Sequence, residues 1–116
     1  MKLVLCGLAV FLAWASSAAE AKVLKTDCGT MQKLAREHSI DMARRDTLDH
    51  AGFAERAKRG ARAENVASGN SSRAMTMAQW RASPPHAANM LLPGCKGIAS
   101  AVSRTGRHYW TLEIGR

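Results

Sequence analysis

The most informative stretch of the chain is WRASPPHAANMLL, residues 80–92. Proline has no backbone N–H to donate, and it forces the residue before it out of the helical region. We therefore expect one helix to end at Ser83 and Pro85 to be an early residue of a second, shorter helix. His86 would then lie in the first turn of that helix, at a rigid corner that suits either a functional or a structural side chain.

The segment before this corner predicts a helix that carries Met77 and Trp80 on one face. Either Ser71 or Ser72 can cap its start, because a serine side chain accepts a hydrogen bond from the first turn of a helix. We place the Trp80 ring in the core, between the first helix of the chain and the sheet.

The segment after the corner predicts a β-hairpin. Two strand-like runs, GIASAVSR and RHYWTLEIG, are separated by the turn residues Thr105-Gly106. Tyr109 and Trp110 are expected on opposite faces of the second run, so one of them packs on the core.

The first helix of the chain is predicted from a stripe of residues at three- and four-residue steps. The stripe consists of Met31, Leu34, Ala35, His38 and Met42. Thr30 is the expected N-cap, and His38 is interpreted as a structural histidine that bonds a backbone group. From Asp46 to Gly60 we expect an irregular connection with Phe53 against the core, and Val66 is too isolated to predict a strand.

The N-terminal residues 1–21 resemble a secretory signal peptide, because Lys2 precedes an apolar run too short to span a bilayer. Cleavage is expected after Ala21, with Ala19 as the alternative. Residues 22–116 would then form one domain, secreted or periplasmic and without a transmembrane segment. In an exported chain the remaining pair, Cys28 and Cys95, predicts a disulfide.

The charge is strongly basic, with a formal net charge of +8 at pH 7 and the densest run between Arg44 and Arg62. A basic face favours anionic partners such as lipid headgroups or envelope polymers, although it also serves solubility. We expect no nucleic-acid partner, because Phe53 is the one aromatic residue in this run and offers no stacking platform.

Three polar residues, His50, Glu64 and His86, each adjoin turn residues, where functional side chains commonly gather. Two imidazoles and a carboxylate suffice for a zinc-type site or for general acid and base. Their spacings match no local metal motif, and the sequence contains no HExxH, CxxC or GxSxG. Spacing alone therefore leaves a shared site and three unrelated side chains both open.

The segments TLDHAGFAERAKRG, AENVASG, AQWRASPPHAANML, GIASAV and HYWTLEIG, in this order, resemble the CAP superfamily of secreted proteins in its short bacterial form. The resemblance implies an α+β fold, a three-layer α-β-α sandwich with a small antiparallel sheet and a shortened first helix. It also implies that His50, Glu64 and His86 line one cleft. Ser83 matches the fourth cleft position, which is acidic in many relatives.

The resemblance implies binding more than catalysis. We expect a secreted, monomeric module for a ligand, lipid, envelope polymer or protein partner, with no cofactor required. One alternative is a metal-assisted hydrolase in which His50 and His86 bind a divalent metal such as zinc and Glu64 activates water. Another is a cationic envelope-binding module with a vestigial cleft.

Overall fold

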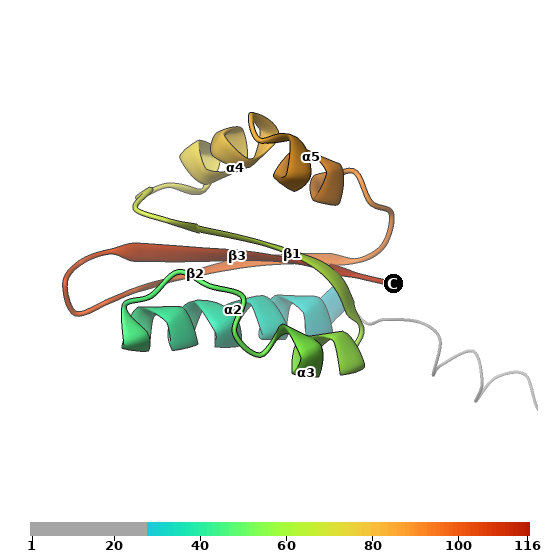
Figure 1. Cartoon of the computed structure of the whole chain (residues 1–116), viewed down its shortest axis with the longest axis horizontal. Coiled ribbons are helices and arrows are strands. Elements are labelled where there is room, and N and C mark those ends of the chain that lie inside the picture. Colours follow the sequence, from blue (N-terminus) through green and yellow to red (C-terminus); the bar gives the residue numbers. More distant parts are fainter. Residues whose placement is uncertain (1–27) are drawn as a thin grey trace, which may run out of the picture.

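The computed structural model describes residues 28–116, which form three layers around a small sheet (Figure 1). The sheet is antiparallel, with strand order β1-β3-β2. Helices α2 and α3 lie on one face, and α4 and α5 lie on the other. The elements are α2 (Cys28–Arg45), α3 (Phe53–Lys58), β1 (Ala61–Ser68), α4 (Arg73–Arg81), α5 (Pro84–Met90), β2 (Lys96–Val102) and β3 (His108–Gly115). The predicted α+β sandwich is confirmed, whereas the predicted signal peptide at 1–21 lies outside the described residues.

Helix α2 buries the predicted stripe against the sheet, and Met31, Leu34 and Met42 are fully buried. Thr30 is not its N-cap, because the helix already includes Cys28. The helix packs directly on the backbone of β2. A Cβ atom at Gly97 would overlap the backbone of Met31 and Gln32, so glycine is required there for the close approach.

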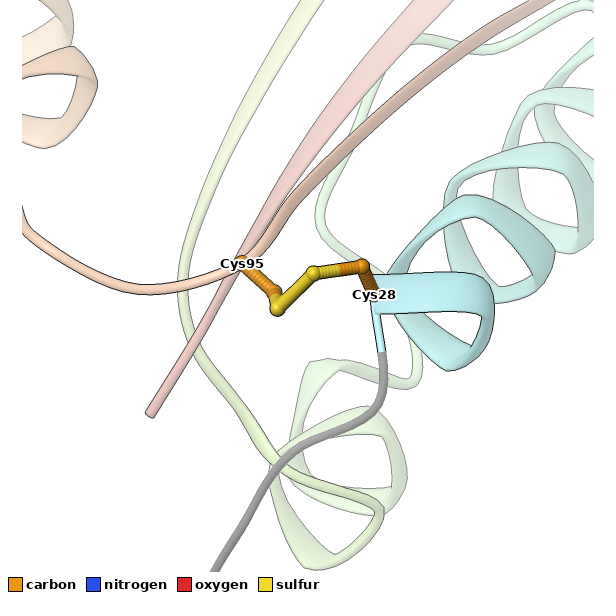
Figure 2. The surroundings of a disulfide bond; sticks show 2 residues. All are labelled: Cys28 and Cys95. Carbon is orange, nitrogen blue, oxygen red and sulfur yellow. A yellow bond between two sulfur atoms is a disulfide. The ribbon is translucent and has the colours of Figure 1, made fainter.

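A disulfide confirms the predicted pairing of Cys28, in the first turn of α2, with Cys95, just before β2 (Figure 2). The two Cα atoms are 4.8 Å apart, and the cysteines are separated by 67 positions in the sequence. In the chain-entropy model, closing a loop of this length stabilises the fold by about 4 kcal/mol.

The predicted β2–β3 hairpin is present, and its connection is closed by a hydrogen bond from Ser103 N to Arg107 O at 2.9 Å. Strand β1 was not predicted. Its sequence, ARAENVAS, is rich in alanine and has little strand propensity of its own. It forms because β3 supplies its ladder partners, with Glu64 opposite Glu113 and Val66 opposite Thr111.

The segment Asp46–Gly60 is not wholly irregular, because it contains α3. Gly52, with φ of 78°, precedes this short helix, and Phe53 is half-buried against the cluster of Met31 and Leu34 as expected. The sequence FAERAK has no apolar stripe that would predict a helix. The tertiary contacts of Arg56, described below, hold it in place.

The opposite face of the sheet carries an apolar cluster built around Trp80, with Trp110, Leu112 and Ile114 from β3. Trp80 is 1 % exposed, as predicted, but it lies between α4 and the sheet rather than beneath the first helix. Its indole Nε1 donates to Val66 O at 3.2 Å. Tyr109 and Trp110 do face opposite sides, and both are buried because each face is covered by helices.

The proline corner joins α4 to α5. Helix α4 is capped by Ser72, which accepts a hydrogen bond from Met75 N, and it ends at Arg81, two residues before the expected end at Ser83. Ser83 is instead the N-cap residue of α5. Both prolines occupy the first two positions of α5, where a missing N–H is harmless, and His86 follows in the first turn. Within residues 28–116, no helix combines the length and apolar character needed to cross a bilayer.

Candidate functional site

Glu64, on edge strand β1, is the centre of a buried polar cluster. Its side chain is 1 % exposed and lies on the α2 side of the sheet. Oε1 accepts from His50 Nδ1 at 2.8 Å and from Arg56 Nη2 at 3.0 Å, while Oε2 accepts from Arg56 Nε at 2.6 Å. Arg56 also donates to Ala51 O, which ties the loop before α3 to the same cluster.

Glu113, on the central strand β3, lies directly across the ladder from Glu64 and is fully buried. Its Oε1 is 3.1 Å from Arg56 Nε, but the single hydrogen on that nitrogen is directed at Glu64. Neither Glu113 oxygen has a well-aligned hydrogen bond. Burial, together with the facing Glu64 carboxylate, raises the pKa of Glu113 far above its ordinary value. Glu113 is therefore protonated at neutral pH.

Glu64 has the opposite state. Burial alone would raise its pKa, but the facing protonated Glu113 and the hydrogen bonds from Arg56 and His50 outweigh burial, and the net pKa of Glu64 is lowered. Two facing carboxyl groups thus share one arginine, with one group ionised and the other neutral. This arrangement lets both be buried, since two carboxylates in contact could not remain charged together.

His38 belongs to the same cluster. Its Nε2 is 2.8 Å from Asp49 O, and because a carbonyl can only accept, Nε2 carries the hydrogen. This confirms the predicted bond between a buried histidine and a backbone group. The ring also lies 3.5 Å from Glu64 Oε1, a contact that the sequence did not suggest.

A second pair, Ser83 and His86, lies on the opposite side of β1. His86 Nδ1 is 2.8 Å from Ser83 Oγ. Asn65 anchors this corner, because its Nδ2 donates to His86 O at 3.0 Å and its Oδ1 accepts from Asn89 Nδ2 at 3.0 Å. Glu64 and Asn65 are neighbours in β1 whose side chains alternate, so one strand positions both pairs.

The four predicted residues are therefore brought together as two pairs, His50 with Glu64 and Ser83 with His86. No hydrogen bond or ion pair among residues 28–116 joins one pair to the other. In the same range, no group of three or more His, Cys, Asp or Glu side chains is arranged to hold a metal ion. The two pairs flank β1, with the α2–α3 loop on one side and α5 on the other (Figure 1).

The sequence analysis missed Arg56 and Glu113. A signal for Glu113 was available, because it alternates with Tyr109 and Thr111 along a strand predicted to face the core. An acidic residue at such an inward position requires a partner. Arg56 had no comparable signal, since it sits in a polar segment with five other basic residues nearby.

Among known proteins, one family matches most of the chain. The family model described as CAP, the cysteine-rich secretory protein family, matches residues 10–114, which is well over half of the chain. No curated protein matches the chain.

Proposed function

The chain belongs to the cysteine-rich secretory protein (CAP) family, and we propose from this that it is an exported binding module, in which His50 and His86 receive the polar part of a ligand. The observation that supports the proposal most directly is the way in which a hydrogen bond to Glu64 orients the exposed ring of His50. Its Nδ1 donates to a carboxylate that is 1 % exposed, whereas its own side chain is 54 % exposed. Nε2 is thereby presented to solvent as a pre-oriented hydrogen-bonding group.

His86 supports the same role on the other side of β1. Its Nδ1 is engaged by Ser83 Oγ, and its ring is half-buried at the start of α5. The fixed φ angles of Pro84 and Pro85 hold this turn rigid. A ligand that spans the edge of β1 would meet His50 from the α2–α3 side of the sheet and His86 from the α4–α5 side.

The hydrogen bonds of Glu64 favour binding over metal-assisted hydrolysis. A catalytic base needs a free lone pair directed at the water that it activates. Three of the four lone-pair positions of the Glu64 carboxylate already accept hydrogen bonds from Arg56 and His50, and the carboxylate is buried. Without Glu64, two imidazoles remain, which is fewer than the three protein ligands of a catalytic zinc site. These observations favour the binding hypothesis over the hydrolase hypothesis.

The net charge of +8 suggests the class of ligand. An exported basic protein meets anionic lipid headgroups and anionic envelope polymers, to which its field attracts it. We propose that an anionic envelope component binds at the two histidines, with a hydroxyl group of the ligand donating to His50 Nε2 and the basic surface attracting its anionic group. The remaining alternative is a cationic module that adheres through its arginines alone.

The experiment compares His50→Asn, His86→Asn and the double variant in co-sedimentation with vesicles of phosphatidylglycerol, using phosphatidylcholine vesicles as the reference. We expect each single variant to weaken binding to phosphatidylglycerol and the double variant to weaken it further, with unchanged melting temperatures. Arg81→Ala, which changes an exposed charge on α4, is the matched control. If binding falls with salt but ignores both histidines, the adhesive alternative is correct and the proposal is wrong.

A further inference from the structure

The outer edge of β2 is the second feature of the molecule that can receive a partner. We propose that this edge binds an extended, acidic peptide segment as an additional strand. The sheet order β1-β3-β2 leaves β2 exposed on the side away from β3, at the opposite edge of the sheet from His50 and His86. The inference is therefore independent of the proposed ligand site.

The hydrogen bonds of Ile98 reveal which backbone groups point outward. Ile98 N donates to Gln32 Oε1 at 3.0 Å, and Gln32 Nε2 donates to Ile98 O at 2.7 Å. The side-chain amide of Gln32 thus imitates the backbone of a neighbouring strand at this one position. In an antiparallel ladder, residues two apart direct their N–H and C=O groups to the same side. Ser100 and Val102 therefore also face outward.

Ser100 and Val102 are both exposed, and Val102 is 54 % exposed. Beyond Ile98, no side chain among residues 28–116 caps the outward backbone groups of these two residues. An unpaired edge of this kind is a template for another strand. Gln32 therefore covers the edge of β2 at Ile98, whereas the edge at Ser100 and Val102 is open.

A groove runs beside the open part of the edge, with a volume of about 510 Å³. Its floor is formed by Ile40 and Ala43 of α2 and by Ala101 and Val102 of β2. A strand added to β2 would direct alternate side chains toward this floor. Small apolar side chains at alternate positions of the partner would fit it.

Charge identifies the partner as acidic. Arg44 and Arg104 line the groove, and no acidic residue does. Some arginines of the described chain are paired with carboxylates, such as Arg45 with Asp41 and Arg59 with Glu37. Arg44 and Arg104, by contrast, have no ion pair among residues 28–116. Carboxylates of a partner at this position would gain two unopposed cations.

The same charges argue against a second copy of the chain as the occupant. Pairing β2 with β2 of another copy would join two edges that each carry Arg44 and Arg104, and like charges at an interface are unfavourable. A free anionic amphiphile could occupy the groove, but it would leave the backbone groups of Ser100 and Val102 unpaired. An acidic strand can make all three interactions: apolar side chains contact the groove floor, carboxylates pair with Arg44 and Arg104, and its backbone bonds to the edge of β2.

The test uses the full chain and a short synthetic peptide in which valine and glutamate share the groove-facing positions and threonine occupies the positions between them. Binding is followed by backbone amide shifts in NMR. We expect saturable shifts at Ser100 and Val102, and none with a peptide in which lysine replaces glutamate. Val102→Pro removes an outward N–H without removing a bond to β3, so it should weaken binding roughly fivefold to tenfold. Val102→Thr, which keeps the N–H, is its matched control.

Charge reversal provides a second, backbone-neutral variant. Arg44→Glu with Arg104→Glu should abolish binding of the acidic peptide and create binding of the lysine peptide, whereas Arg81→Glu should change neither. The proposal is overturned if the acidic peptide does not bind, or if it binds without shifts at the β2 edge. It is also overturned if dodecanoate alone fills the groove, or if β2 becomes protected only as protein concentration rises. Because His50→Asn leaves this edge untouched, failure here is distinguishable from failure of the histidine site.

Discussion

The two faces of the sheet differ in the kinds of side chain that they bury. The face covered by α4 and α5 is apolar and is organised around Trp80, Trp110 and Leu112. The face covered by α2 and α3 buries Glu64, Glu113, His38, Ser39 and Thr111 beside its apolar residues. Burying polar groups contributes little net stability but fixes their geometry. The first face therefore contributes mainly apolar packing, and the second holds the buried polar network around Glu64 that orients His50.

The polar face adds a close backbone approach and a covalent bond to its own apolar packing, which includes Met31, Leu34 and Met42. Helix α2 touches the backbone of β2 at Gly97, and Cys28 joins the start of the helix to Cys95. The apolar face has neither device among the described residues. Its two helices are short. Helix α4 buries Trp80, whereas α5 has no buried side chain and packs on the cluster through the partly buried Met90.

The largest expected effect is on the apolar face. Trp80→Ala should lower the free energy of unfolding by about 3–5 kcal/mol, because it removes a fully buried aromatic ring and its hydrogen bond to Val66 O. Urea unfolding followed by circular dichroism measures the change. Leu91→Ala, at an apolar residue that is 84 % exposed, is the control and should change stability little. A small effect at Trp80 would remove the distinction between the two faces.

The sequence was informative where local chemistry and periodicity decide structure. The stripe of α2, the serine cap at Ser72, the proline corner and the β2–β3 hairpin all follow from such rules. Strand β1 could not be predicted, because its alanine-rich sequence acquires strand structure only from pairing with β3. Trp80 was correctly predicted as buried but was assigned to the wrong face, since burial alone does not say which helix covers it.

The second expected effect is a pH dependence that originates on the polar face. The folded-state pKa of Glu113 is raised, so between its unfolded value near 4.3 and its folded value the native state binds more protons than the unfolded state. Stability must then fall as pH rises through this window, by up to about 1.4 kcal/mol per pH unit. Glu64 acts in the other direction, because its lowered pKa makes its contribution disappear as pH falls below about 4.3.

Glu113→Gln tests this assignment, since glutamine imitates the protonated carboxyl but cannot ionise. We expect the variant to gain up to about 3 kcal/mol at pH 7 and to lose the decline in stability between pH 5 and 9. Chemical unfolding across this pH range is the measurement. Glu55→Gln, at an exposed glutamate on α3, is the control and should keep the decline. A variant that retains the wild-type slope would show that Glu113 is not the titrating group.

The candidate site was only partly accessible to sequence reasoning, for a reason that Glu113 illustrates. His50, Glu64 and His86 were singled out because they adjoin turns and match a family pattern. Their partners, Arg56 and Glu113, come from a short helix and a central strand, and distances between such elements are set by the tertiary fold. The division into two pairs on either side of β1 likewise depends on the direction in which Glu64 and Asn65 alternate, which required β1 to be recognised as a strand.

The smallest expected effect is the coupling between two buried hydroxyl groups on the polar face, those of Ser39 and Thr111. Ser39 Oγ lies 2.8 Å from Thr111 Oγ1 and 3.1 Å from Ala99 O, and with one hydrogen it can donate to only one of them at a time. Ser39→Ala should lower stability by about 1–2 kcal/mol, because it leaves the buried Thr111 hydroxyl without its partner. Thr111→Val should lower stability by less, because Ser39 Oγ can still donate to Ala99 O. The double variant leaves no orphaned hydroxyl in the pair, so its loss should be smaller than the sum of the single losses by about 1 kcal/mol. Thermal unfolding of the four proteins in a double-mutant cycle measures this coupling. Strictly additive losses would mean that the two hydroxyls act separately, and that the polar face is stabilised by packing in the same way as the face that contains Trp80.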